Sequence, residues 1–235
     1  MIGCSCDVCT SENPKNKRTR CSVWIEEQDT SIIIDTATDF RSQALREGVY
    51  DVHAVLLTHA HADHVHGLDD IRSFTYKHPV PFYGNIPTID EVRQRFQYIF
   101  ADTQIGGGKP KISLHYVSEP FQVGSVHIVP VPIMHGSLPI LGFRIGGFAY
   151  LTDCSGIPEE SYGLLHDIDV AVIGALRYRP HETHYSVSQA VAEIEKIAPR
   201  RAYLTHLCHR LEHEKLLQEL PDHIRPAWDG LTLFV

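Results

Sequence analysis

The sequence predicts an α/β fold in which β-strands and α-helices alternate along one domain covering residues 1–235. Short apolar runs of strand length recur between segments with helical periodicity. Several of these runs are followed at once by a histidine or an aspartate, so the ends of the predicted strands carry the chemistry. With 43% hydrophobic and 21% charged residues, a chain of 235 residues can bury a sizeable core.

Composition and charge exclude several classes of protein. No apolar run approaches the length that spans a bilayer, and the N-terminus lacks the apolar segment of a signal peptide, so we expect a cytoplasmic protein without a membrane partner. The formal net charge of -8 argues against extended nucleic acid as a partner but allows a small anionic substrate. Six cysteines without a secretory signal do not suggest disulfides, whereas sixteen histidines point to metals. The oligomeric state stays open, a homodimer included.

Three thiols lie close together near the N-terminus, at Cys4, Cys6 and Cys9. One tight loop could wrap a single ion with them, and soft thiolates select zinc once a fourth nitrogen or sulfur ligand completes the tetrahedron. The alternatives are a redox-active Cys-x-x-Cys pair and reactive surface thiols. Cys21 precedes a predicted strand and is expected to be a small, buried apolar residue. A solvated loop, rather than a phosphate contact, is expected at Lys15, Lys17, Arg18 and Arg20.

Three strands and a helix are predicted between the cysteines and the histidine-rich motif at residues 58–70. A polar turn at Gln28 and Asp29 joins the first two strands. The helix ends at Gly48, a residue type that favours helix C-termini. The third strand is apolar and leads directly into the motif. These strands are expected at residues 22–26, 31–35 and 52–57, and the helix at residues 39–47.

The segment after the third predicted strand concentrates metal-ligand side chains. It runs from residue 58 to residue 70 and contains His59, His61, Asp63 and His64. Residues two apart in an extended segment point to the same side, so His59 and His61 can bind one ion. Asp63 and His64 lie where the chain should turn into a helix and can serve a second ion. Two ions about 3.5–4 Å apart can share and activate one water. The alternative is a histidine-rich loop that only solvates a turn.

Several elements separate this motif from the next candidate ligand. A helix is expected at residues 67–74, with Asp69 and Asp70 in its first turn, where negative charge is favourable. Residues 101–110 contain Gly-Gly-Gly-Lys but continue with proline instead of serine or threonine, so we expect a flexible loop that does not bind phosphate. A longer helix at residues 88–100 has one apolar face, made by Ile89, Val92, Phe96 and Ile99. Further strands are expected at residues 80–83 and 112–117.

Two isolated candidate ligands follow predicted strands. His135 is the natural third ligand for the ion of His59 and His61, although a lone histidine is usually structural. Asp153 ends the second strand of a predicted hairpin, and its two carboxylate oxygens could bridge two ions. The alternative for Asp153 is the N-cap of the helix that follows. The three strands and the helix are expected at residues 126–131, 141–145, 148–152 and 158–166.

A loop with two histidines follows the buried strand predicted at residues 170–174. The loop contains His181 and His184, and both are well placed to face a ligand. Ser186 and Gln189 match a capping box, so the next helix is expected to begin there.

Two more histidines, His206 and His209, follow the last predicted core strand. His206 is positioned to bind the ion of Asp63 and His64. His209 could point the other way and complete the thiol site, with Cys208 as the rival fourth ligand. The strand before His206, the next helix and a final strand are expected at residues 201–205, 212–220 and 231–235.

Together these motifs resemble the signature of the metallo-beta-lactamase-fold hydrolases. The cysteine cluster and the final His-x-x-His are similar to those of the phosphoribosyl 1,2-cyclic phosphate phosphodiesterase (PhnP-like) branch. The resemblance implies a four-layer αββα sandwich of two mixed sheets flanked by helices. Branch members usually open with a strand and a Gly-Thr-Gly-type loop, so we expect this chain to be truncated or to lack the first strand. The implied structural zinc site is Cys4, Cys6, Cys9 and His209, and the implied ligands of two catalytic ions are His59, His61, Asp63, His64, His135, Asp153 and His206.

The resemblance implies hydrolysis of a small, cyclic phosphodiester such as a ribose cyclic phosphate, with His184 as the acid and base residue. A hydroxide shared by two ions of zinc, manganese or iron would attack phosphorus. His184 and Asp63 are the candidate catalytic residues, and His184, with a pKa not far from neutrality, would act as the general acid and base. The alternatives are a nuclease or tRNA-processing hydrolase, an ester, thioester or lactone hydrolase, and a metal-binding regulatory module without turnover.

Overall fold

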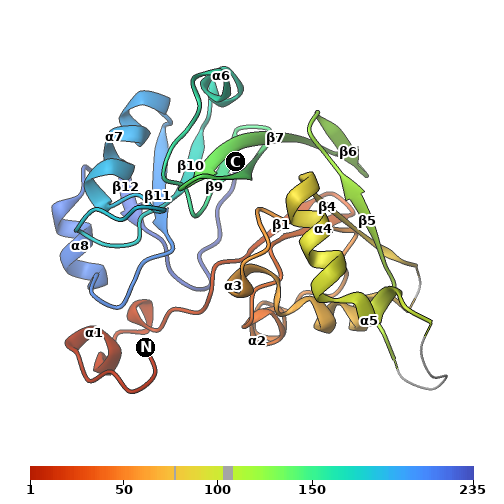
Figure 1. Cartoon of the computed structure of the whole chain (residues 1–235). Coiled ribbons are helices and arrows are strands. Elements are labelled where there is room, and N and C mark those ends of the chain that lie inside the picture. The colour runs from red at the N-terminus through yellow and green to blue at the C-terminus, as the bar shows by residue number, and fades with distance from the viewer. Residues whose placement is uncertain (77, 103–107) are drawn as a thin grey trace. The chain divides into compact units, whose positions relative to one another are not determined.

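The computed structural model describes residues 1–76, 78–102 and 108–235. The chain divides into two compact units, each with its own sheet and its own apolar core (Figure 1). Unit 1 consists of Met1–Thr19 and Val131–Val235, and unit 2 consists of Arg20–Pro130. Within the described part of the chain, no helix has the length and apolar character needed to cross a membrane.

Unit 2 contains a five-stranded sheet whose strands follow one another in sequence order. The first two strands form an antiparallel hairpin, and every later strand pairs in parallel with the one before it. Because the last four strands are parallel, their carboxyl ends lie at one edge of the sheet, where α/β proteins place functional side chains. The strands are β1 Val23–Glu27, β2 Thr30–Ile34, β3 Ala54–Leu56, β4 Val80–Gly84 and β5 Ile112–Tyr116.

Helical segments pack against this sheet and form the core of unit 2. Ile33, Val55 and Phe82 are register neighbours on adjacent strands, and they pack with Phe40 and Ile89 from the helices. Side chains alternate along a strand, so these three residues share the helix-facing side of the sheet. The segments are α2 Phe40–Glu47, α3 Ala62–Val65, the 3₁₀ helix η2 Leu68–Phe74, α4 Ile86–Arg95 and α5 Gln97–Phe100.

Local chemistry explains where unit 2 departs from the sequence predictions. The helix predicted at residues 88–100 begins earlier, because the Asn85 side chain accepts a hydrogen bond from the Thr88 amide at 3.0 Å and caps it. It is also interrupted at Phe96, whose backbone leaves the helical region. Residues 67–74 are helical but form a 3₁₀ helix. Part of the loop predicted at residues 101–110 lies outside the described residues.

Unit 1 contains a mixed sheet. Strand β7, Val126–His135, begins in unit 2 and continues into unit 1, where the strand order is β12-β11-β10-β9-β8-β7. Strands β9 to β12 are parallel, and β8 and β9 form an antiparallel hairpin. The other strands are β8 Leu138–Ile145, β9 Phe148–Leu151, β10 Val170–Gly174, β11 Arg201–Thr205 and β12 Ile224–Pro226.

The core of unit 1 lies between its sheet and α7, which contacts β10 and β11. Ser186 and Gln189 form the predicted capping box, so α7 begins directly after the histidine loop. Its apolar face packs Ala190 and Ile194 with Ile173 of the sheet. The helical segments are α1 Asp7–Thr10, η1 Pro14–Asn16, α6 Glu159–Tyr162, η3 Gly163–Leu165, α7 Val187–Ile197 and α8 His213–Glu219.

Three strand predictions need correction. Strand β7 extends through Pro132 to His135, so His135 belongs to the strand rather than to a loop after it. A short strand, β6 Phe121–Val123, was not predicted, and it pairs antiparallel with the start of β7. The strand predicted at residues 231–235 is wrong. The edge of the sheet is taken by β12 instead, where Pro226, which lacks an amide hydrogen, is tolerated. The prediction of two mixed sheets flanked by helices is confirmed.

Candidate metal centres

The carboxyl end of β3 presents the first pair of candidate ligands. Nε2 of His59 lies 3.0 Å from Nδ1 of His61, and His59 is completely buried. Two imidazole nitrogens on one tetrahedral ion lie about 3.3 Å apart, given metal–nitrogen bonds of about 2.0–2.1 Å. The Thr58 hydroxyl lies 3.0 Å from Nδ1 of His59 and orients the ring. The two histidines are therefore placed to hold one ion between them, as their spacing predicts.

Helix α3 carries the second pair. It begins at Ala62, so Asp63 lies in its first turn and His64 is turned into the protein. Nε2 of the buried His64 lies 3.6 Å from a carboxylate oxygen of Asp63, whose side chain is 41% exposed. A nitrogen and an oxygen at this separation can bind the same ion.

Asp35, which was not predicted to belong to the site, orients both pairs of candidate ligands. It directly follows β2, is fully buried and adopts a left-handed backbone with φ of 63°. Its carboxylate accepts hydrogen bonds from the amide and the hydroxyl of Thr58, at 2.9 and 2.7 Å, and lies 2.7 Å from Nδ1 of His64. Burial raises the pKa of Asp35 and the neighbouring His64 opposes this rise. The sequence could have identified Asp35 as a site residue, because it is an aspartate at the end of a predicted strand. The same feature identified Asp153.

This contact determines which nitrogen of His64 can bind a metal. A carboxylate accepts, so Nδ1 of His64 carries the hydrogen and Nε2 carries the lone pair. Metal-binding histidines usually donate their second nitrogen to a carboxylate or a carbonyl in this way.

In unit 1, His135 shows the same arrangement. Nδ1 of His135 donates to the backbone oxygen of Thr183 at 2.7 Å, so the lone pair lies on Nε2. Gly136 follows in a left-handed conformation, φ 62°, and its amide donates to the hydroxyl of Ser155 at 2.7 Å. These bonds hold the end of β7 against two other loops of the unit.

Asp153 and His206 lie at the ends of β9 and β11. Their backbones adopt φ values of 52° and 57°, which are uncommon for residues with a side chain, and such residues concentrate at functional sites. An oxygen of Asp153 lies 3.4 Å from Nε2 of His206. Gly174 makes room for this turn, because a Cβ there would lie 2.9 Å from the Asp153 amide nitrogen. The N-cap alternative for Asp153 is wrong, since Pro158 occupies that position before α6.

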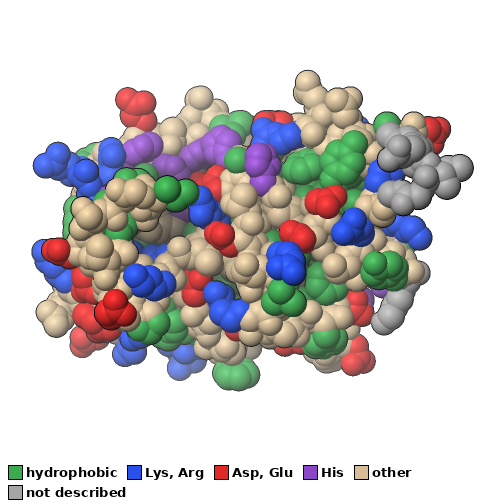
Figure 2. Space-filling model, turned by 90° about the horizontal axis from the view of Figure 1, so that it is seen from below, with side chains coloured by type: hydrophobic (Ala, Val, Ile, Leu, Met, Phe, Trp, Pro, Cys, Tyr) green, Lys and Arg blue, Asp and Glu red, His purple; other side chains and the backbone are tan. Residues whose placement is uncertain are grey.

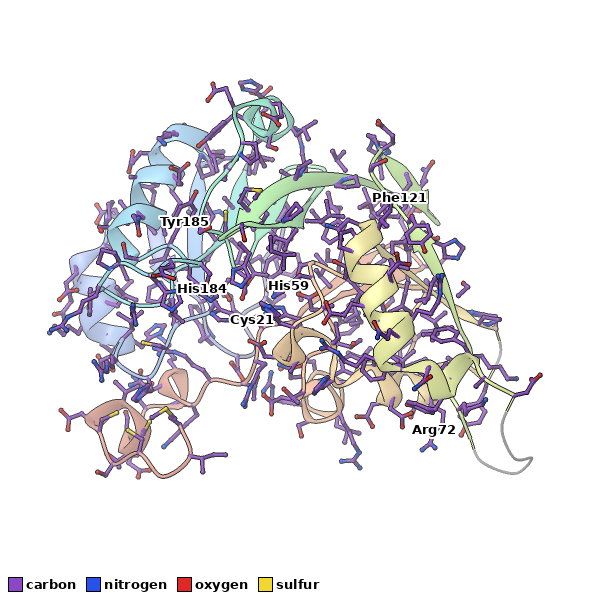
Figure 3. All side chains as sticks on the ribbon, viewed as in Figure 1. Cys21, His59, Arg72, Phe121, His184 and Tyr185 are labelled. Atoms are coloured by element: carbon purple, nitrogen blue, oxygen red, sulfur yellow. The ribbon has the colours of Figure 1, made fainter. Side chains whose placement is uncertain are left out.

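His184 lies beside these two residues in the loop before α7 (Figure 3). Its Nδ1 is 3.7 Å from Asp153, its ring centroid is 4.6 Å from that of His135, and it stacks on His206 at 5.0 Å. Burial lowers the pKa of His184 to about 4, although the Asp153 carboxylate opposes this effect. The expectation of a pKa near neutrality is therefore wrong, and the imidazole is neutral at pH 7.

The cysteine cluster and His209 come together within unit 1, with one potential ligand atom from each residue within 4.8 Å of the others. Sγ of Cys4 and Sγ of Cys6 each lie 3.4 Å from Nδ1 of His209. Sulfur and nitrogen on one tetrahedral zinc lie about 3.6 Å apart, so the donor set and its dimensions fit zinc. Hydrogen bonds from the Cys9 backbone and from His209 lower the pKa of Cys6 to about 6. Among the described residues, Cys208 is not part of this cluster.

The basic segment after the cysteines is solvated in part, because Lys17 and Arg20 are exposed while Lys15 and Arg18 contact the protein. Arg18 is half-buried and donates to the backbone oxygen of Cys208 at 3.3 Å. Lys15 lies 3.5 Å from Glu214 and over the ring of Trp228. Through these contacts the segment attaches the cysteine loop to residues around α8. Cys21 is only partly buried, which corrects the expectation of a core residue.

Comparison with known proteins identifies the class. The chain belongs to the beta-lactamase superfamily, because a sequence model of the beta-lactamase superfamily domain matches residues 30–207. Within it the chain is PhnP-like: a solved structure described as a new diphosphatase from the PhnP family is 39% identical, with a TM-score of 0.93 over 100% of this chain and 91% of that one. The chain is a metal-dependent hydrolase with the metallo-beta-lactamase fold.

Two further relatives differ in what they share with this chain. The octanoyltransferase of Porphyromonas gingivalis (strain ATCC BAA-308 / W83) is 40% identical over 239 residues, which cover 100% of this chain and 48% of that protein. The chain thus spans about half the length of this curated relative. The metallo-beta-lactamase fold protein YhfI from Bacillus subtilis shares the fold at 19% identity, with a TM-score of 0.74 over 93% of this chain and 92% of that one.

Proposed function

We propose that the chain is a dinuclear-metal phosphodiesterase acting on a small phosphodiester, such as a ribose cyclic phosphate or an esterified diphosphate. The observation that carries the proposal is the orientation of the strand-end histidines. Asp35 and the backbone of Thr183 hold His64 and His135 by Nδ1, as metal-binding histidines are held. Identity of 39% to a PhnP-family diphosphatase supports the substrate class.

We assign the candidate ligands of both units to one centre and treat residues 1–235 as a single hydrolase domain. Each unit supplies imidazoles and a carboxylate, a donor set that accepts zinc, manganese or iron. The proposed ligands are His59, His61 and His135 for one ion, Asp63, His64 and His206 for the other, and Asp153 for both.

Bound divalent ions would supply positive charge for the phosphoryl oxygens and lower the pKa of a water. The protein's own residues would then manage the protons. A neutral His184 would accept a proton as the water oxygen attacks phosphorus. The same proton would pass to the leaving oxygen as the P–O bond to the leaving group breaks, an ester bond in a cyclic phosphate and an anhydride bond in a diphosphate, which restores the neutral imidazole. Asp63, which is partly exposed, would orient the attacking water in addition to binding its ion.

The second proposed metal is a structural zinc bound by Cys4, Cys6, Cys9 and His209. It would join the first residues of the chain to the segment that follows β11, which also carries His206. Zinc binding would thereby stabilise the position of a catalytic ligand.

The proposal is tested by metal analysis of the purified protein together with assays across added zinc, manganese and iron. The substrates are a ribose cyclic phosphate, an esterified diphosphate, bis(4-nitrophenyl) phosphate, a short RNA and an octanoyl thioester. We expect two catalytic ions, one tightly held zinc and metal-dependent turnover of the phosphodiesters. The variant Asp153→Asn should lose both catalytic ions together, whereas Asp167→Asn, which changes an aspartate outside the site, should keep them.

Other outcomes would select the rival functions. Turnover of RNA alone would indicate a nuclease, and metal binding without turnover of any substrate would indicate a regulatory module. Loss of a single ion from Asp153→Asn would contradict the shared centre.

Thioester hydrolysis is the second candidate, because the matching relative from Porphyromonas gingivalis is named an octanoyltransferase. Half of that protein lies outside the match, so its acyl-transfer activity need not reside in the region similar to this chain. Preferential turnover of the octanoyl thioester would establish this candidate over the first.

A further inference from the structure

His181 lies in the loop between β10 and α7, and the proposed metal centres make no use of it. We propose that His181 contacts the substrate on the leaving-group side, where its Nε2 hydrogen binds an anionic oxygen of a second phosphoryl group. Substrates whose leaving group is itself a phosphate ester would then be preferred. The inference rests on the proposed function and assigns the residue that would select an esterified diphosphate among its substrates.

The hydrogen bonds of His181 determine the position of its proton. The Thr183 amide donates to Nδ1 of His181 at 3.2 Å, and the Thr183 hydroxyl lies 3.3 Å from the same nitrogen. A backbone amide can only donate, so Nδ1 is the acceptor and the hydrogen of the neutral ring is on Nε2. The loop therefore presents an N–H donor.

That donor is available to a ligand. Within residues 1–76, 78–102 and 108–235, Nε2 of His181 makes no hydrogen bond, and the half-buried residue keeps part of its ring open to solvent. Figure 2 shows histidine side chains (purple) at the surface of the molecule.

His181 is a direct neighbour of His184, the proposed general acid and base. The ring centroids of His181 and His184 are 5.1 Å apart. If His184 serves the leaving oxygen, His181 reaches the atoms attached to that oxygen. In an esterified diphosphate these atoms are the oxygens of a second phosphoryl group, whereas in a simple diester they belong to an uncharged group.

The loop is held rigid before any substrate binds. Arg177 donates from Nε to the backbone oxygen of Arg179 at 3.1 Å and from a terminal nitrogen to that of Pro180 at 2.8 Å. The amide of Leu176 donates to the backbone oxygen of Tyr185 at 3.0 Å and closes the base of the loop. Such preorganisation lowers the entropy lost when a ligand is bound. The loop carries two guanidinium groups, those of Arg177 and Arg179, and one carboxylate, that of Glu182. Its net charge is therefore positive.

The test compares three variants of the metal-loaded full chain. His181→Asn keeps an acceptor for the Thr183 amide but withdraws the distal donor, because asparagine accepts from the amide two residues on. His181→Gln reaches farther and restores an N–H near the position of Nε2. His166→Ala changes an exposed histidine of unit 1 and is the matched control. The substrates are an esterified diphosphate and bis(4-nitrophenyl) phosphate, and the ligands for calorimetry are pyrophosphate and inorganic phosphate.

We expect His181→Asn to lower kcat/KM for the diphosphate roughly 10- to 100-fold, the usual range for a hydrogen bond to a charged group. Turnover of bis(4-nitrophenyl) phosphate should change less than about threefold, since that contact is absent. Pyrophosphate binding should weaken more than phosphate binding, and His181→Gln should recover part of both losses.

Equal losses on both substrates, or unchanged pyrophosphate binding in His181→Asn, would overturn the assignment. A wild-type protein that hydrolyses neither substrate would refute the proposed function, and calorimetry with pyrophosphate would still decide the role of His181. The two failures are therefore distinguishable.

Discussion

The carboxylate of Asp35 lies 2.7 Å from Nδ1 of His64, and neither side chain is accessible to solvent. The contact joins the end of β2 to α3, 29 residues later in the chain. It determines the tautomer of a candidate metal ligand, and Asp35 also binds Thr58, the residue before His59.

Replacing Asp35 should therefore weaken metal binding without removing a ligand. In Asp35→Asn the neutral amide is a poorer acceptor for His64, and loss of such a supporting carboxylate typically lowers metal affinity 10- to 100-fold. Competition with a chelator measures the affinity. Asp29→Asn, in the exposed turn between β1 and β2, is the control and should bind metal normally. Unchanged affinity in Asp35→Asn would show that the contact is not needed for binding.

His184 is expected to act on protons and not to hold metal. His184→Ala should slow turnover by roughly 10²- to 10⁴-fold, the usual contribution of general acid–base catalysis. The metal content should stay at the wild-type value, which mass spectrometry of the purified variant measures. Normal turnover would remove the assigned role, and a missing ion would make His184 a ligand, for which it lies close enough to His135 and Asp153.

Variants of Cys6 and Cys208 test whether His209 or Cys208 is the fourth ligand of the structural zinc. Cys6→Ser removes a thiolate that lies 3.4 Å from His209 and should lose one zinc per chain. Limited proteolysis should then cut within the first nineteen residues, because zinc would no longer join the cysteines to His209. Cys208→Ser should retain zinc and resist cleavage. Loss of zinc from Cys208→Ser as well would assign the fourth ligand to Cys208, and retention of zinc in Cys6→Ser would contradict both sites.

His213 should make stability depend on pH. It is 1% exposed, and burial, assisted by nearby Lys15, lowers its pKa below the usual value of about 6.5. The unfolded chain therefore binds more protons than the folded one between these two pKa values. The free energy of unfolding should fall as the pH drops below about 6.5, by at most about 1.4 kcal/mol per pH unit from this group.

Urea unfolding at several pH values, with zinc in excess, measures this effect. His213→Phe keeps a ring against Trp228 and should flatten the acidic slope, whereas His166→Phe, at an exposed position, should keep it. An unchanged slope in His213→Phe would mean that other groups cause the acid sensitivity.

Local features of the sequence predicted much of this fold and many of the candidate ligands. Val170–Gly174 and Arg201–Thr205 have the predicted bounds: the first is an apolar run that ends at a glycine, and the second is an apolar core between Arg201 and Thr205. The start of α7 follows from Ser186 and Gln189, whose hydrogen bonds span three residues. Side-chain chemistry also singled out the histidines, aspartates and cysteines, because few residue types bind metals.

Contacts between distant residues decided the rest. The roles of Asp35 and Thr183 depend on partners 29 and 48 residues away, and no local pattern records such pairs. The pKa of His184 follows from burial, which packing alone creates. The last strand was misplaced because residues 231–235 are apolar enough for a strand, while only the sheet determines that Ile224–Pro226 pairs with β11. Local sequence determines which helices and strands form and which residue types can bind a metal. Packing determines which distant residues contact these candidate ligands, and these contacts set their tautomers and pKa values.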